Sequence, residues 1–288
     1  MRAAHIEELK SVPRVVEVDD ADGLQVAAVA LNPLDLAVGS GVFYGGHPPL
    51  PYVPGCEAVG RRPDGSLAYL FGEGRGVARD GFLQERVPTT LDIELALPDG
   101  TDPALAACAG IAGIAAWVPV AWKAKVGAGD RVLVLGGTGS VGRVAAQAAE
   151  LLGAAHVVAV GSKDLDRIPQ EFGDEGFTVC IDPVWGEPLA DALQYAQRHA
   201  RIVHIGQSAG AQSPLKSADV RGKELVIMGH SNFALSKEER DRAHLELLEH
   251  LTAGRIELDY ETFALKDVAE AWNHQRHGKS VVRLEEAS

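Results

Sequence analysis

The chain has 288 residues, 46% of them hydrophobic, which is enough for one large domain or two modest ones. Its formal net charge is −13 and its lysines and arginines are dispersed, which argues against nucleic acid and anionic membranes as partners. No apolar run approaches the length needed to cross a bilayer, and the first ten residues lack the apolar core of a signal peptide, so we expect a cytoplasmic protein.

The N-terminal part of the chain is predicted to be rich in β-strands. Short strands are expected over residues 12–19 and 24–31, and a loop region rich in glycine and proline follows over 39–60. An alanine-rich segment over 103–116 then predicts a helix. The cysteines are far apart and show no metal-binding or disulfide spacing, so we expect buried thiols at Cys56, Cys108 and Cys180.

The most informative segment begins at residue 131. A short apolar run over 132–135 predicts a buried strand, a glycine-rich turn follows at once, and apolar residues then recur at helical spacing. Strand, glycine turn and helix in this order predict a dinucleotide-binding turn, in which backbone N–H groups and the helix N-terminus face a pyrophosphate. The predicted cofactor contacts in this turn are Gly137, Thr138, Gly139, Ser140, Val141 and Gly142.

The residues after the next strand bear on the choice of cofactor. The strand predicted over 155–160 ends in Gly161, Ser162 and Lys163, with no carboxylate where a ribose 2′-hydroxyl would bind. A hydroxyl and an ammonium there suit a 2′-phosphate, which favours NADPH with Ser162 and Lys163 as contacts. Asp164 is the alternative carboxylate, and we interpret it as a cap on the next helix because it lies beyond the strand.

From residue 131 onward, strands alternate with helices, which predicts a parallel sheet. Further strands are expected over 177–181, 201–205 and 224–228, with helices over 189–198, 236–252 and about 268–276. Ser236 and Glu239 are expected to form a capping box at the start of the second of these helices. Polar and glycine residues fall at or just past these strand ends, where an open α/β sheet binds its ligand. The predicted contacts there are Gly206, Ser208, Ser231 and Asn232, whereas His204 is interpreted as a core histidine.

One motif suggests another enzyme class. The segment from Gly206 to Gly210 matches G-x-S-x-G, the turn that carries the nucleophile of α/β-hydrolases. That motif needs a helix directly behind the serine, but the following residues include Pro214 and show no amphipathic pattern. We therefore do not expect a hydrolase.

Taken together, these segments resemble the medium-chain dehydrogenase/reductase superfamily, and specifically its zinc-free quinone oxidoreductase branch. The resemblance covers nearly the whole chain and implies an α/β fold: a Rossmann doubly wound parallel sheet plus a GroES-like, β-rich domain. Besides the glycine turn, it rests on Leu31-Asn-Pro-Leu-Asp35, Leu50-Pro-Tyr-Val-Pro-Gly-Cys-Glu-Ala-Val-Gly60, Gly110-Ile-Ala-Gly-Ile-Ala-Ala-Trp117, Val126-Gly-Ala-Gly-Asp-Arg-Val-Leu-Val134 and Gly278-Lys-Ser-Val-Val282.

The resemblance implies a substrate domain over 1–118, completed by 255–288, and an NADPH-binding domain over 119–254. Zinc enzymes of the superfamily hold a catalytic metal at positions that correspond here to Asn32, Cys56 and Ile111, which cannot form a three-ligand site, so no metal is expected. The resemblance also places Asn32 and Tyr44 at the active site, where each could donate a hydrogen bond to a quinone or enone oxygen.

The chain is short for this family. The stretch 164–176 has too few residues for the usual helix, strand and helix, so one βα unit of the Rossmann sheet is expected to be trimmed. Three functions stay open: an NADPH-dependent reductase of quinones or α,β-unsaturated carbonyls, an enoyl reductase or tailoring enzyme of a biosynthetic pathway, and a catalytically degenerate NADPH-binding protein. A homodimer through the last strand, with Leu225 and Ile227 near the interface, is also expected.

Overall fold

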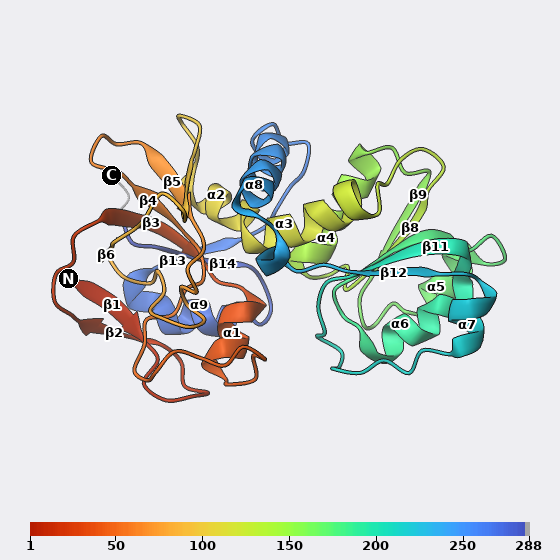
Figure 1. The fold of residues 1–288 in the computed structure, drawn as a ribbon, viewed down its shortest axis with the longest axis horizontal. Coiled ribbons are helices and arrows are strands. Elements are labelled where there is room, and N and C mark those ends of the chain that lie inside the picture. Colours follow the sequence, from red (N-terminus) through yellow and green to blue (C-terminus); the bar gives the residue numbers. More distant parts are fainter. Residues whose placement is uncertain (286–288) are drawn as a thin grey trace. The chain divides into compact units, whose positions relative to one another are not determined.

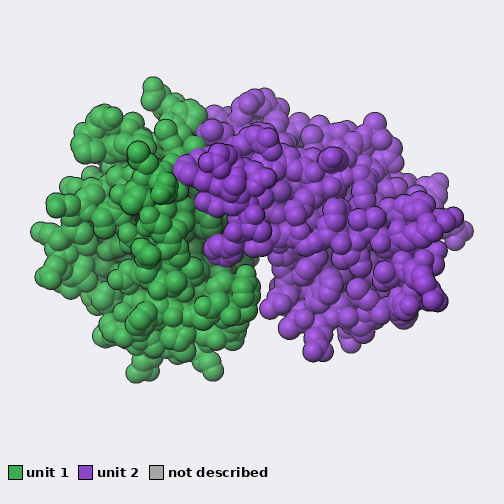
Figure 2. Space-filling view, in the orientation of Figure 1, with its two compact units in different colours: residues 1–111, 259–288 green, residues 112–258 purple. Residues whose placement is uncertain are grey.

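The computed structural model describes residues 1–285 (Figure 1). The chain divides into two compact units: Met1–Ile111 together with the segment from Asp259 onward form unit 1, and Ala112–Leu258 form unit 2 (Figure 2). These divisions fall a few residues from the expected boundaries at 118/119 and 254/255. The last three residues of the expected substrate domain, 286–288, lie outside the described part of the chain.

Unit 1 is built around a mostly antiparallel sheet in the order β13-β14-β3-β4-β5-β7, with β6 also paired to β3. The tail joins this sheet because β14 pairs antiparallel with β3. A separate hairpin is formed by β1 and β2. The strands are β1 Arg2–His5, β2 Arg14–Glu17, β3 Leu24–Ala30, β4 Ala58–Arg61, β5 Leu67–Leu70, β6 Arg86–Val87, β7 Glu94–Ala96, β13 Glu261–Ala264 and β14 Ser280–Arg283, and the helices are α1 Pro33–Gly39, α2 Pro103–Ala109 and α9 Val268–His274.

Unit 2 is a doubly wound parallel sheet in the order β12-β11-β10-β8-β9. Figure 1 shows α5, α6 and α7 along one face of this sheet and α4 on the other. The strands are β8 Arg131–Leu135, β9 His156–Val160, β10 Phe177–Asp182, β11 Ala196–His204 and β12 Val226–Gly229, and the helices are α3 Ile111–Val118, α4 Ser140–Leu151, α5 Arg167–Phe172, α6 Gly186–Ala192, α7 Ser217–Gly222 and α8 Lys237–Thr252.

The parallel sheet is one strand short of the usual dinucleotide-binding fold. The common strand order is 3-2-1-4-5-6, and β8, β9, β10, β11 and β12 correspond to strands 1, 2, 4, 5 and 6. Within residues 1–285, no strand pairs with the outer edge of β9, and the chain passes from β9 to β10 through α5, a helix of six residues. This confirms the expected fold class, including the trimmed βα unit.

Two predicted helices were wrong in their extent. The helix over 103–116 is interrupted at Gly110, where ψ is −116°, and α3 starts afresh at Ile111. The helix over 189–198 ends at Ala192, because the chain from Ala196 joins β11 and pairs with the start of β10. By contrast, α8 begins at the predicted cap, where Ser236 and Glu239 form a capping box.

A buried polar network explains the interruption at Gly110. The carboxylate of Glu57 is fully buried, and its Oε2 accepts hydrogen bonds from the backbone N–H of Ile111 and from the hydroxyl of Tyr69. A Cβ on Gly110 would lie 1.9 Å from this oxygen, so only glycine allows the carboxylate to reach the start of α3.

Lys279 and Asn32 complete the network. The Nδ2 of Asn32 donates to Glu57 Oε1 at 2.7 Å, and Lys279 Nζ lies 3.8 Å from the same oxygen. Lys279 also donates to Asn32 Oδ1 at 2.7 Å and to the Leu31 carbonyl at 2.8 Å. Burial raises the pKa of Glu57, while the positive charge of Lys279 and the hydrogen bonds from Asn32, Ile111 and Tyr69 oppose that rise.

This network predicts a large cost for removing its cation. We expect Lys279→Met to lower the free energy of unfolding by about 3–5 kcal/mol in urea denaturation, because it leaves the buried Glu57 carboxylate uncompensated. The double variant Glu57→Gln/Lys279→Met removes both charges and should recover part of that loss. The control is Lys266→Met at an exposed lysine near the same end of the chain. If Lys279→Met and Lys266→Met unfold with equal free energies, the network does not stabilise the fold as proposed.

Candidate functional site

The predicted cofactor residues gather at one edge of the unit 2 sheet. Because all five strands run parallel, their carboxyl ends meet at this edge. The glycine turn follows β8, Gly161 to Lys163 follow β9, Gly206 and Ser208 follow β11, and Ser231 and Asn232 follow β12. The switch point of the sheet, where neighbouring strands lead to opposite sides, lies between β8 and β10.

The glycine turn has the packing that a phosphate-binding turn requires. A Cβ on Gly137 would lie 2.7 Å from the Cβ of Ala159 in β9, and one on Gly142 would lie 2.3 Å from the carbonyl oxygen of Gly136. These two glycines let the turn pack on β9 and the helix pack on the turn. Gly139, by contrast, is exposed, and the nearest atom to its added Cβ is 3.5 Å away, so the approach to the backbone there is open.

The N-terminus of α4 has backbone N–H groups available to bind an anion. Its N-cap is Gly139, and no side chain caps the helix. The first-turn N–H groups of Ser140, Val141 and Gly142 have no partner within a helix, and the helix dipole adds partial positive charge at this end. With twelve residues behind it, this N-terminus suits a pyrophosphate.

Charges of both signs follow β9. Ser162 and Lys163 are exposed. The interpretation of Asp164 as a helix cap is wrong, because α5 starts later and its N-cap is Asp166. Asp164 instead turns back toward the strand, and its Oδ2 lies 3.4 Å from where a Cβ of Gly161 would be. An exposed ammonium and a carboxylate therefore both follow the end of β9, where the ribose is expected.

The ends of β11 and β12 present close-packed backbone and one buried histidine. A Cβ on Gly206 would lie 2.9 Å from the Pro183 carbonyl oxygen, and Ser208 is exposed beyond it. Asn232 is buried, and its Oδ1 lies 2.9 Å from Nε2 of His230. Burial lowers the pKa of His230 to about 4, so this imidazole is neutral at neutral pH.

Sequence reasoning missed a pair of side chains at the same edge. The side chain of His204, interpreted as a core residue, is 28% exposed at the end of β11, and its Nδ1 lies 3.0 Å from Oδ2 of Asp182 at the end of β10. An acid and a histidine that each close a buried parallel strand are the signal that could have revealed this pair.

The segment that matches the hydrolase motif is a loop. Residues 206–216 form no helix, and α7 starts only at Ser217, nine residues after Ser208. Strand β11 precedes the motif, but the helix that must start directly behind the serine is absent from these residues, in agreement with the expectation that this is no nucleophile turn.

The two predicted catalytic residues of unit 1 have contrasting surroundings. Asn32 is buried, and its Nδ2 group donates to Glu57 and also to the Ala30 carbonyl at 3.1 Å, which uses both amide hydrogens. Tyr44 is 84% exposed, and its ring packs on Phe43 with the ring centroids 4.5 Å apart. Only Tyr44 therefore has a donor that a ligand can reach.

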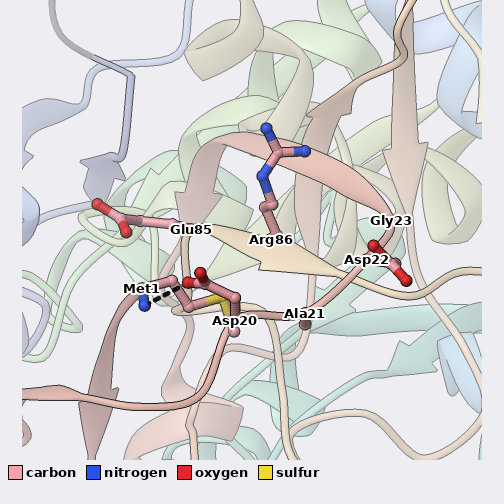
Figure 3. A pocket seen from close by; sticks show the side chains of 7 residues that line it. All are labelled: Met1, Asp20, Ala21, Asp22, Gly23, Glu85 and Arg86. Atoms are coloured by element: carbon pink, nitrogen blue, oxygen red, sulfur yellow. Dashed lines mark hydrogen bonds and ion pairs between the residues drawn. The ribbon is translucent and has the colours of Figure 1, made fainter.

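The structure also bears on metal binding, on membrane-spanning helices and on surface hollows away from the candidate site. Among residues 1–285, no three His, Cys, Asp or Glu side chains are grouped to hold a metal ion. In the same range no single helix is long and apolar enough to cross a membrane, although the bent pair Pro103–Ala109 and Ile111–Lys123 passes by length and composition. An open hollow beside Met1 contains none of the predicted site residues; it is lined by Met1, Asp20, Ala21, Asp22, Gly23, Glu85 and Arg86 (Figure 3).

Known proteins match this chain along most of its length. A sequence model of the zinc-binding dehydrogenase family matches residues 152–281. Human quinone oxidoreductase is 25% identical over 282 residues, which cover 88% of this chain and 85% of that protein. A component of the phenolphthiocerol/phthiocerol polyketide synthase of Mycobacterium tuberculosis is 26% identical over 299 residues, which cover 91% of this chain but 13% of that longer protein.

Solved structures share the fold. An NAD-dependent alcohol dehydrogenase matches with a TM-score of 0.84 at 22% identity, covering 99% of this chain and 100% of that one. Escherichia coli quinone oxidoreductase, solved in complex with NADPH, matches with a TM-score of 0.81 at 20% identity over the same shares of both chains. These matches support the resemblance to the medium-chain dehydrogenase/reductase superfamily and its quinone oxidoreductase branch, and the solved structures show that the fold is shared.

Proposed function

We propose that this protein is an NADPH-dependent, metal-free reductase of quinones or α,β-unsaturated carbonyls. The observation that carries the proposal is the uncapped N-terminus of α4 behind a turn whose glycines are required by packing. The residues of the turn fit a pyrophosphate, since the backbone at Gly139 is open and the adjacent N–H groups are free. The quinone oxidoreductases among the matched proteins support the reaction class.

The proposed cofactor would be held along the carboxyl edge of the unit 2 sheet. When bound, NADPH supplies the hydride. The turn from Gly137 to Gly142 binds the diphosphate, while Ser162 and Lys163 bind the 2′-phosphate. Gly206, Ser208, Ser231 and Asn232 line the other end of the edge, where the nicotinamide would lie.

For the substrate, we propose Tyr44 as the hydrogen-bond donor to the carbonyl oxygen. Its hydroxyl is exposed and would stabilise the negative charge that develops on this oxygen as the hydride arrives. Asn32 is better described as a positioning residue, because its amide hydrogens are already used by Glu57 and Ala30.

A second candidate function has its own support. The match to a polyketide synthase favours an enoyl reductase of a biosynthetic pathway, which uses the same hydride chemistry on a larger substrate. The trimmed βα unit beside β9 favours a third candidate, a protein that binds NADPH without turnover. Turnover with small quinones separates the first candidate from both of the others.

The first prediction concerns cofactor preference. We expect NADPH to bind at least about tenfold more tightly than NADH, a difference of about 1.4 kcal/mol, because Lys163 pairs with the 2′-phosphate. Lys163→Ala should reduce this ratio, as measured by calorimetry with both cofactors. Equal affinities of the parent protein for the two cofactors, or a preference for NADH, would contradict the predicted NADPH preference.

A neighbouring variant serves as the matched control. Asp164 lies close to the same position, and its negative charge repels a phosphate. Asp164→Asn should therefore raise the NADPH-to-NADH affinity ratio, opposite in direction to Lys163→Ala. If both variants shift the ratio in the same direction, the 2′-phosphate does not bind between them.

The second prediction concerns catalysis. We expect Tyr44→Phe to lower the turnover number with a quinone by about tenfold or more, while the dissociation constant for NADPH stays nearly unchanged, because the hydroxyl acts on the substrate. Tyr195→Phe, in unit 2, is the control, and activity should survive dialysis against a chelator. If Tyr44→Phe turns over as fast as the parent protein, the Tyr44 hydroxyl is not the hydrogen-bond donor to the substrate.

The third prediction concerns assembly. β12 is an edge strand on which Val226 is 47% and Ile227 is 37% exposed, while the neighbouring Leu225 is partly buried and packs against the unit 2 core. We propose that two such edges pair in a homodimer. Ile227→Asp should give a monomer in light scattering, whereas Leu151→Asp, at an equally exposed leucine on α4, should not. A monomeric parent at micromolar concentration would refute the dimer.

A further inference from the structure

Asp182 and His204 lie side by side at the carboxyl edge of the unit 2 sheet. They are the last residues of β10 and β11, and the parallel register makes them direct partners. His204 Nδ1 lies 3.0 Å from Asp182 Oδ2. The strand pairing itself therefore brings the two residues next to each other at this edge.

Asp182 is held as a fixed acceptor. It is fully buried, and its Oδ1 accepts hydrogen bonds from the backbone N–H groups of Val184 at 3.0 Å and Trp185 at 2.8 Å. These backbone donors orient the carboxylate so that Oδ2 faces the imidazole. Because a carboxylate only accepts, the proton between the two groups is assigned to Nδ1 of His204. Nε2 is then the nitrogen that can exchange a proton with a ligand.

Trp185 holds the imidazole from its other side. The two rings lie with centroids 4.2 Å apart at an angle of 43°. Trp185 has φ of 60° and ψ of −157°, a strained backbone conformation that non-glycine residues rarely adopt. The hydrogen bond from its N–H to Asp182 and its packing on His204 offset this strain. Strain retained beside a titratable group is typical of a functional site.

Nε2 of His204 is available to a ligand. Within residues 1–285 it has no hydrogen-bond partner, and the side chain is 28% exposed. Since the proposed diphosphate site lies at the turn between β8 and α4 and the adenosine half lies toward β9, the β10 and β11 ends belong to the nicotinamide half of the edge. His204 therefore lies in the half of the site where the hydride is transferred.

We propose that His204, oriented by Asp182, is the proton donor of the reduction, an inference that rests on the proposed function. When bound, NADPH would supply a hydride to the substrate carbon. The imidazolium form of His204, protonated on both ring nitrogens, would give its Nε2 proton to the electron pair of the substrate π bond. The Nε2–H bond breaks and an O–H or C–H bond forms on the product. The neutral imidazole then regains a proton from water, while Nδ1–H stays bonded to Asp182.

The first arm of the test does not depend on turnover. Diethyl pyrocarbonate modifies accessible imidazoles, and mass spectrometry measures the rate at each histidine. We expect saturating NADP⁺ to slow the modification of His204 about tenfold or more. The control is His199, earlier on the same strand, whose side chain is 64% exposed and lies 3.3 Å from Glu224; its rate should stay unchanged.

The second arm uses His204→Gln with His199→Gln as its matched control. His204→Gln should lower the turnover number about a hundredfold, with the NADPH dissociation constant within about twofold of the parent value. If NADP⁺ binds in calorimetry without protecting His204, or if His204→Gln turns over like the parent, His204 is not the donor and the proposed function stands. If the parent binds no NADP(H) at all, the proposed function and this inference both fail.

Discussion

The parallel pairing of β8 with β9 on one side and β10 on the other is the constraint on which the candidate site depends. Parallel strands bring the glycine turn, the segment from Gly161 to Lys163 and the Asp182–His204 pair to one edge, although these residues are far apart in the sequence. The close packing of Gly137 on β9 and of Gly142 on Gly136 then fixes the start of α4 against that edge. Binding, proton transfer and cofactor choice would all depend on this geometry.

A second constraint acts inside unit 1. One buried carboxylate, Glu57, is bonded to the start of α3, to Tyr69 in β5 and to Asn32 at the start of α1, with Lys279 beside β14 as its cation. Such a group is costly to bury, and it is tolerated here because it accepts three hydrogen bonds and has a buried cation nearby. The network explains why the helix is interrupted between α2 and α3. Together with the Ala30 carbonyl, it also engages both hydrogens of the Asn32 amide, so that neither is available to a substrate.

Sequence patterns predicted the parts of the fold that local chemistry determines. The strand, glycine turn and helix from residue 131, the capping box at Ser236 and the trimmed unit after β9 all follow from spacing and chain length. The break at Gly110 and the early start of β11 were not predictable, because each depends on a partner distant in the sequence, Glu57 for the first and β10 for the second. The Asp182–His204 pair forms through strand register, and its sequence signal, an acid and a histidine at the ends of two neighbouring buried strands, was overlooked. The direction in which Asp164 turns is a tertiary property as well.

We propose that the carboxyl edge of unit 2 supports hydride transfer from NADPH to a small conjugated carbonyl. Anaerobic NADPH oxidation with a panel of quinones and enones, followed at the nicotinamide absorbance with product analysis, measures this transfer. We expect oxidation that requires an acceptor and yields the reduced acceptor in equal amount. Tight NADPH binding without oxidation by any acceptor in the panel would contradict it and would favour a binding protein without turnover.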